Sequence, residues 1–151
     1  MDWIYGIQKA LDYVEAHLTD EIDYEAAAKE AYSSSFHFQR AFSILCGYTL
    51  GDYIRMRRLT LAAEELIRTD KKVLDIALKY GYNTPESFCR AFSAFHGITP
   101  TQARHGENVR SFSRLSVKLT VYDLRSIITT TIVNSDNSGY YMLQNHFGYE
   151  N

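Results

Sequence analysis

The sequence contains an internal repeat. When residues 27–50 are shifted by 50 positions onto residues 77–100, ten of the 24 pairs are identical without a gap. The identical pairs are Ala27/Ala77, Lys29/Lys79, Tyr32/Tyr82, Phe38/Phe88, Arg40/Arg90, Ala41/Ala91, Phe42/Phe92, Ser43/Ser93, Gly47/Gly97 and Thr49/Thr99. Self-similarity at a fixed offset indicates that one supersecondary unit is used twice. Any fold proposed for this chain must place the same unit at both positions.

Each copy has the pattern of two short helices separated by a tight turn. The first helices are predicted at 24–31 and 73–80, and the second helices at 36–46 and 86–96. Ser34 and Thr84 suit the N-cap positions of the second helices, and Gly47 and Gly97 suit their C-terminal caps. Two helices joined by a turn of about three or four residues form a helix-turn-helix. The predicted fold class is therefore mainly α, with two helix-turn-helix subdomains.

Further helical patterns precede the repeat and connect its copies. Apolar residues between Ile4 and Leu18 recur at helical spacing and predict a helix over residues 2–18. Residues 49–69 predict a long linker helix. A helix of about 20 residues spans roughly 30 Å, close to the roughly 34 Å of one turn of B-DNA. A rod of this length suits two reading helices that enter successive major grooves of one duplex.

The pattern changes to strands after residue 106. Leu115–Val121 alternates apolar and polar residues, Ile127–Val133 is rich in β-branched residues, and Tyr140–Leu143 predicts a third strand after a turn at Asn134–Gly139. About 45 residues are few for an independent core. We predict a DNA-binding domain over residues 1–106 and a short β-rich C-terminal extension over residues 107–151.

Charge is distributed unevenly along a chain whose net charge is −2. Acidic residues dominate residues 1–23, whereas Arg40, Arg55, Arg57 and Arg58 stand against Asp52 alone between residues 40 and 58. A duplex responds to the local field within roughly 8–10 Å, so the net charge does not exclude nucleic acid. Two cysteines far apart favour a reducing cytoplasm over a disulfide scaffold, and no apolar stretch is long enough to predict a membrane span.

Motifs for catalysis or metal binding are missing from the sequence. The five histidines and two cysteines do not have the spacing typical of a metal site. No nucleophile elbow, phosphate-binding loop or dinucleotide fingerprint is present. We therefore predict that the chain is not an enzyme and uses no cofactor. An outward-facing Cys89 leaves redox sensing open as a minor alternative.

The second helix of each copy divides into an apolar face and an outward face. The apolar faces carry Phe38, Ala41, Phe42 and Leu45, and Phe88, Ala91, Phe92 and Phe95. The candidate base-contact residues on the outward faces are Ser35, Phe36, Gln39, Arg40, Glu86, Ser87, Cys89 and Arg90. Arginine suits guanine and glutamine suits adenine in the major groove. The candidate phosphate contacts are Ser34, His37, Arg55, Arg57, Arg58 and Thr84.

The arginines and Phe36 each have a simpler alternative. Arginines on a helix are also typical of a solvated surface, and Arg90 is placed to pair with Glu86 at i,i+4. Phe36 also fits a role in covering the local core. The repeat and Gln39 favour DNA contact for Arg40, whereas Glu86, one turn before Arg90, weakens the same interpretation for Arg90.

Three segments together resemble the AraC/XylS family of transcription regulators. They are residues 32–42, residues 47–59 and the run from Ile76 to Pro100. The resemblance covers about residues 1–106 and implies seven helices, with two recognition helices joined by a long linker helix. It implies base contact by Phe36, Gln39, Arg40, Ser87 and Arg90. It also implies a cytoplasmic, sequence-specific regulator of double-stranded DNA. Two non-identical units in one chain can bind asymmetric DNA as a monomer, which leaves the oligomeric state open, and RNA polymerase is a candidate partner.

Several features depart from the family pattern. Phe36 stands where some members carry tryptophan, and Glu86 and Cys89 stand where polar residues are common. An acidic residue repels phosphate unless it accepts from cytosine, so the second copy is expected to read more weakly. Asn108–Val121 is similar to the start of an effector-binding region, which leaves residues 107–151 as a truncated remnant or a different appendage. The alternative functions are a helical protein-interaction module with residual DNA binding and a ligand-sensing tail.

Overall fold

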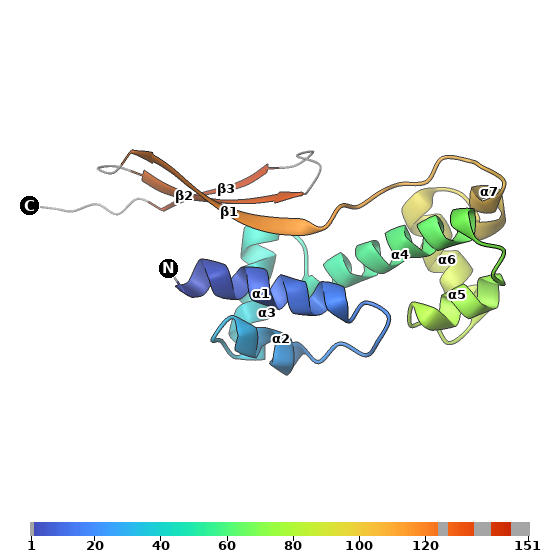
Figure 1. The fold of residues 1–151 in the computed structure, drawn as a ribbon, viewed down its shortest axis with the longest axis horizontal. Coiled ribbons are helices and arrows are strands. Elements are labelled where there is room, and N and C mark those ends of the chain that lie inside the picture. Colours follow the sequence, from blue (N-terminus) through green and yellow to red (C-terminus); the bar gives the residue numbers. More distant parts are fainter. Residues whose placement is uncertain (1, 124–126, 135–139, 146–151) are drawn as a thin grey trace, which may run out of the picture. The chain divides into compact units, whose positions relative to one another are not determined.

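The structure is a computed structural model that describes residues 2–123, 127–134 and 140–145. The described residues form seven helices followed by three strands (Figure 1). The helices are α1 (Asp2–Ala16), α2 (Tyr24–Glu30), α3 (Ser35–Cys46), α4 (Leu50–Arg68), α5 (Val73–Lys79), α6 (Pro85–His96) and α7 (Pro100–Arg104). This mainly α architecture with paired short helices confirms the predicted fold class.

The three strands form one antiparallel sheet in the order β1-β2-β3. They are β1 (Leu115–Asp123), β2 (Ile127–Asn134) and β3 (Tyr140–Asn145). Leu115 pairs with Asn134, and Val133 pairs with Tyr140. The three predicted strands are therefore confirmed, while residues 135–139 of the predicted turn lie outside the described residues.

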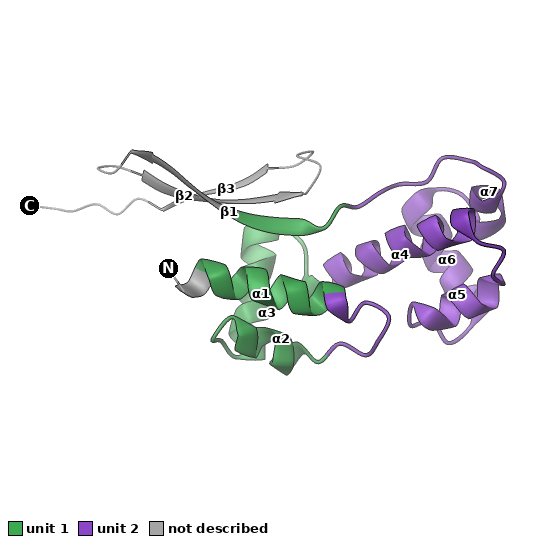
Figure 2. Ribbon diagram, in the orientation of Figure 1, with its two compact units in different colours: residues 1–15, 23–50, 113–151 green, residues 16–22, 51–112 purple. Residues whose placement is uncertain are grey.

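The chain divides into two compact units (Figure 2). Unit 1 contains residues 1–15, 23–50 and 113–151, and unit 2 contains residues 16–22 and 51–112. Each unit thus holds one of the two helix-turn-helix copies. Residues 113–151 belong to the same unit as residues 1–15 and 23–50. This grouping does not test whether residues 1–106 fold alone, so the domain boundary after residue 106 stays a prediction.

Unit 1 is built on buried apolar residues from α1, α2 and α3. Leu11 and Val14 of α1 are fully buried, as is Cys46 at the end of α3. Gly6 permits the close approach of α1 to α2, because a Cβ on Gly6 would lie 2.8 Å from the Cα of Ala31.

The start of the extension is attached to α1 within this unit. The Val117 N–H donates to the Gln8 side chain at 2.8 Å, and Arg114 forms an ion pair with Asp12. Leu115 is fully buried.

Unit 2 packs α5, α6 and α7 against α4. Its core contains Leu59, Ala62, Ala63, Leu66, Ile76, Ala77, Tyr80, Phe88, Phe92 and Ala103. Arg104 ties α7 to the end of α4, because its Nε donates to the Leu66 carbonyl at 3.3 Å. Its Nη2 also donates to the Lys71 carbonyl.

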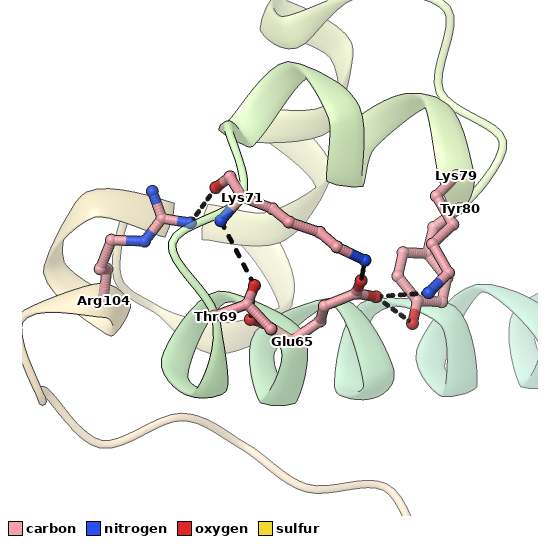
Figure 3. Close-up of polar contacts among 6 residues, drawn as sticks. All are labelled: Glu65, Thr69, Lys71, Lys79, Tyr80 and Arg104. Atoms are coloured by element: carbon pink, nitrogen blue, oxygen red, sulfur yellow. Dashed lines mark hydrogen bonds and ion pairs between the residues drawn. The ribbon is translucent and has the colours of Figure 1, made fainter.

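A polar cluster joins α4 to α5 in unit 2 (Figure 3). The Glu65 carboxylate accepts from Lys71 at 2.6 Å, from Lys79 at 2.8 Å and from the Tyr80 hydroxyl at 3.0 Å. Burial raises the pKa of Glu65, but these hydrogen bonds outweigh burial and lower the pKa to about 2. Glu65 is therefore ionised at neutral pH and fixes the position of α5.

The two copies have matching structures, but their first helices correspond at a different offset from the one used in the ungapped sequence alignment. The Ser33 N–H donates to the Ala28 carbonyl, and the corresponding bond in the second copy runs from Tyr82 to Ala77. The first helices therefore correspond at an offset of 49, while α3 and α6 correspond at 50. The second turn is one residue longer. The identities Ala27/Ala77, Lys29/Lys79 and Tyr32/Tyr82 consequently join non-equivalent positions.

Candidate nucleic-acid interface

Helix α3 presents an ordered N-terminus and a regular outward face. The Ser34 hydroxyl accepts from the His37 N–H at 3.3 Å and lies 2.7 Å from His37 Nδ1. Phe38, Phe42 and Cys46 are buried, and Gly47 ends the helix with a φ of 78°. Burial of every fourth residue leaves one face of the helix directed away from the core.

The outward face of α3 carries an aromatic ring and an arginine. The Phe36 side chain is 68% exposed, and its ring meets the His37 ring edge-on at 5.5 Å between centroids. Phe36 therefore does not cover the local core. Arg40 is exposed, whereas Gln39 is half-buried and donates from Nε2 to the Ser35 hydroxyl at 2.9 Å. The predicted base-contact residues of the first copy thus lie together on α3.

Helix α6 repeats this arrangement with different side chains. Thr84 is the N-cap, and its hydroxyl accepts from the Ser87 N–H at 3.1 Å. Phe88, Phe92 and His96 are buried, and Gly97 has a φ of 77°. Each cap and each buried position therefore has a counterpart in α3.

The outward face of α6 is less uniform than that of α3. Glu86 and Arg90 are exposed, and Cys89 and Ser87 are half-buried. Among the described residues, Arg90 forms no ion pair with Glu86, so the i,i+4 alternative does not occupy this arginine. Arg90 remains available for a contact outside the protein.

The three candidate phosphate arginines on α4 have different surroundings. Arg55 pairs with Asp52 at 3.0 Å while 57% of its side chain is exposed. Arg57 donates from Nη1 to the Phe112 carbonyl. Arg58 donates from Nε to the Leu18 carbonyl at 2.7 Å and from Nη2 to the Asp20 carbonyl at 2.8 Å. Arg57 and Arg58 therefore hold other segments of unit 2 against α4, a role that sequence spacing does not reveal.

His96 is a supporting residue that the sequence analysis missed. Its Nε2 lies 2.9 Å from the Leu59 carbonyl, and its Nδ1 accepts from the Arg110 N–H at 3.1 Å. This pair of bonds requires a neutral ring with its proton on Nε2. Burial lowers the pKa of His96, and the nearby Arg110 charge lowers it further. The only sequence signal was its alignment with Cys46, which gives no indication of these bonds.

A metal site and a membrane-spanning helix are both missing from the described residues. Within it, no group of three or more His, Cys, Asp or Glu residues is arranged to hold a metal ion. Of the helices described, none combines the length and the apolar composition needed to cross a lipid bilayer.

Comparisons with known proteins bear on residues 27–106, which match a family model described as a helix-turn-helix domain. The transcriptional activator AarP of Providencia stuartii is 39% identical over 98 residues, covering 65% of this chain and 73% of AarP. The regulatory protein SoxS of Escherichia coli strain K12 is 37% identical over 99 residues, covering 66% of this chain and 92% of SoxS.

A solved structure gives a further likeness. The DNA-binding domain of the global transcriptional factor AdpA, crystallised with a target DNA, superposes with a TM-score of 0.59 at 25% identity. The superposition covers 66% of this chain and 90% of that chain.

Proposed function

The chain belongs to the AraC/XylS family of DNA-binding transcription regulators, and from that premise we propose that α3 and α6 both read bases in the major groove of one duplex. Sequence-specific recognition by two unequal helices in one chain does not require a dimer. The regulator is proposed to bind an asymmetric site as a monomer.

The observation that carries this proposal is the equivalence of Arg40 and Arg90. Both arginines are exposed and lie at the same position after an N-cap, Ser34 or Thr84. The N-terminal half of a recognition helix is the part that contacts base edges. A guanidinium at this position can donate to both guanine acceptors.

The length of α4 supports binding to successive grooves. The helix has 19 residues, which correspond to about 28 Å at about 1.5 Å per residue. This length approaches one helical turn of B-DNA, about 34 Å. The insertion of α3 and α6 into neighbouring major grooves is therefore part of the proposal.

The proposed contacts follow the two outward faces. Base contact is assigned to Ser35, Phe36, Gln39 and Arg40 of α3 and to Glu86, Ser87, Cys89 and Arg90 of α6. Phosphate contact is assigned to Ser34, His37, Arg55, Arg57, Arg58 and Thr84. Since Arg57 and Arg58 also bond to backbone carbonyls, their removal is expected to lower stability as well as affinity.

RNA polymerase is the proposed protein partner. Leu74 and Leu78 of α5 are 44% and 53% exposed. At the offset of 49, the corresponding residues of α2 are Glu25 and Lys29, so this apolar surface exists in the second copy alone. Replacing Leu78 with Lys is expected to weaken capture of purified RNA polymerase without changing DNA affinity. Unchanged capture would exclude this surface.

The test of DNA reading is selection of sequences from a random duplex pool with the whole chain. The expected product is a motif with two blocks about one helical turn apart. Arg40→Ala is expected to relax one block and Arg90→Ala the other, each by about 1–3 kcal/mol of discrimination. Arg68→Ala is the matched control, because Arg68 is 76% exposed at the far end of α4.

Two outcomes would contradict the proposal in different ways. A motif that both arginine variants retain would exclude α3 and α6 as the reading helices. Salt-sensitive binding without any sequence preference would exclude sequence-specific regulation and favour the protein-interaction alternative.

A further inference from the structure

An open groove with basic walls lies beside α6 in unit 2. Its volume is about 430 Å³. It is lined by Arg55 and Met56 of α4, by Ser87, Arg90 and Phe95 of α6, and by Arg110 from the segment after α7. Ser87 and Arg90 also belong to the proposed reading face, so the groove borders the surface that would meet DNA.

The positive charge of the groove is not balanced by acidic residues in its walls. Three arginines line it, and no lining residue is acidic. Arg55 has one carboxylate partner, Asp52. Within the described part of the chain, Arg90 and Arg110 form no ion pair. A guanidinium is a planar donor that matches phosphate oxygens, so this groove favours a phosphate group.

The backbone on both sides of Arg110 is fixed before any ligand binds. The Arg110 N–H donates to His96 Nδ1 at 3.1 Å, and the Phe112 N–H donates to the Thr60 hydroxyl at 3.0 Å. Val109 packs against the core of unit 2. Arg110 itself is exposed. The segment therefore holds an exposed arginine at the groove at a low ordering cost on binding.

We propose that this groove binds a backbone phosphate of the DNA strand that flanks α6, and that Arg110 is a phosphate contact. This inference rests on the proposed function and extends the interface beyond the two helix-turn-helix motifs. Arg55 and Arg90 form the other basic walls. Met56 and Phe95 give the groove apolar surface that suits contact with a deoxyribose.

The test compares Arg110→Gln with the unaltered chain on the selected duplex, over a series of salt concentrations. Arg110→Gln is expected to lower affinity about tenfold for every sequence and to reduce the salt slope by about one. The selected motif is expected to stay the same. Arg68→Gln removes the same charge outside the groove and is expected to change neither quantity.

A second measurement separates DNA phosphate from free phosphate. Inorganic phosphate is titrated while the side-chain NMR signals of Arg90 and Arg110 are followed, with and without a short duplex. The expected result is weak binding of phosphate that the duplex displaces. Phosphate binding that the duplex leaves unchanged would assign the groove to a free anion and overturn the proposal.

Failure of this inference is distinguishable from failure of the proposed function. If Arg110→Gln keeps the affinity and salt slope of the unaltered chain while Arg40→Ala relaxes its block of the motif, the phosphate site is wrong and DNA reading stands. If the unaltered chain selects no motif, the proposed function fails and the groove assignment fails with it.

Discussion

The two helix-turn-helix copies have a similar backbone arrangement but differ in their exposed side chains. In both, the second helix starts at a hydroxyl N-cap, buries every fourth residue and ends at a left-handed glycine, Gly47 or Gly97. On the outward side, α3 exposes Phe36, whereas α6 exposes Glu86 at the same position. The two copies share their helix caps, most of their core positions and the exposed Arg40 and Arg90, whereas other outward positions differ.

The buried side differs at one position with large consequences. Cys46 and His96 are equivalent residues at the ends of α3 and α6. Burial raises the pKa of the Cys46 thiol to about 12, so it stays protonated and packs as a small apolar group. His96 instead bonds to the Leu59 carbonyl and the Arg110 N–H. The second copy therefore has a polar link to the following segment at a position where the first copy has only packing.

The sharpest test of this difference is truncation at both positions. His96→Ala is expected to lower the free energy of unfolding by about 3 kcal/mol, because it removes a buried ring and takes away the acceptor of the Arg110 N–H. Cys46→Ala is expected to lower it by about 1 kcal/mol. Urea unfolding measures both. Equal losses would mean that the His96 bonds add nothing to stability.

Glu65 provides a second test of how the two copies differ in stabilising contacts. Glu65→Gln is expected to lower the free energy of unfolding by about 2 kcal/mol, since the carboxylate is only 11% exposed and accepts from two lysines and Tyr80. The corresponding end of α2 carries Glu30 and Ala31 in place of Lys79 and Tyr80.

The matched control for Glu65→Gln is Glu64→Gln. The Glu64 side chain is 45% exposed and lies 4.0 Å from Arg68, so its replacement is expected to cost under about 0.5 kcal/mol. Similar losses for the two variants would show that the cluster in Figure 3 acts as an ordinary surface ion pair.

Substitutions in the two turns are expected to change the free energy of unfolding in opposite directions. Tyr32 has a φ of 52°, and Gly81 occupies the equivalent place with a φ of 87°. Tyr32→Gly is expected to raise the free energy of unfolding by about 1 kcal/mol by relieving left-handed strain. Gly81→Ala is expected to lower it by about 1 kcal/mol for the same reason. Thermal unfolding distinguishes the signs, and shifts in the same direction would contradict the equivalence of the turns.

The smallest expected effect is a pH dependence from His96. Its pKa in the folded protein lies below the ordinary value of 6.5, so the unfolded chain binds the proton more tightly. The stabilising contribution is complete above pH 6.5 and is lost as the pH falls below it. Urea unfolding at several pH values measures this slope. His96→Gln is expected to flatten it, and an unchanged slope would assign the effect to other histidines.

Much of the fold was predictable from the sequence because the helices and strands have regular periodicity. The ends of α3 and α6 follow from Ser34, Thr84 and the two capping glycines. The helix bounds predicted from the sequence, 24–31 and 73–80, already differ by 49, but the alanine and lysine identities of the ungapped alignment at 50 hide this offset. Backbone hydrogen bonds show that the first helices correspond at 49 and that the second turn is one residue longer.

The candidate site was predictable where it depends on helix faces and unpredictable where it depends on long-range contacts. Exposure of Phe36, Arg40 and Arg90 follows from a period of 3.6 residues. The bonds of Arg57 to Phe112 and of Arg58 to Leu18 join residues 55 and 40 positions apart. No local pattern encodes such pairs, so the sequence offered only phosphate contact or a solvated helix face for these arginines.

The unequal outward faces of α3 and α6 have a consequence for the geometry of gene control. A regulator that is a two-fold symmetric dimer recognises a palindrome and binds it equivalently in both orientations. Under the proposed function, a chain with Phe36 on one reader and Glu86 on the other reads its site in a single direction. Inverting the site would turn the bound protein around. The orientation of the operator would thus determine which flanking DNA lies on the side of α5 and its exposed leucines.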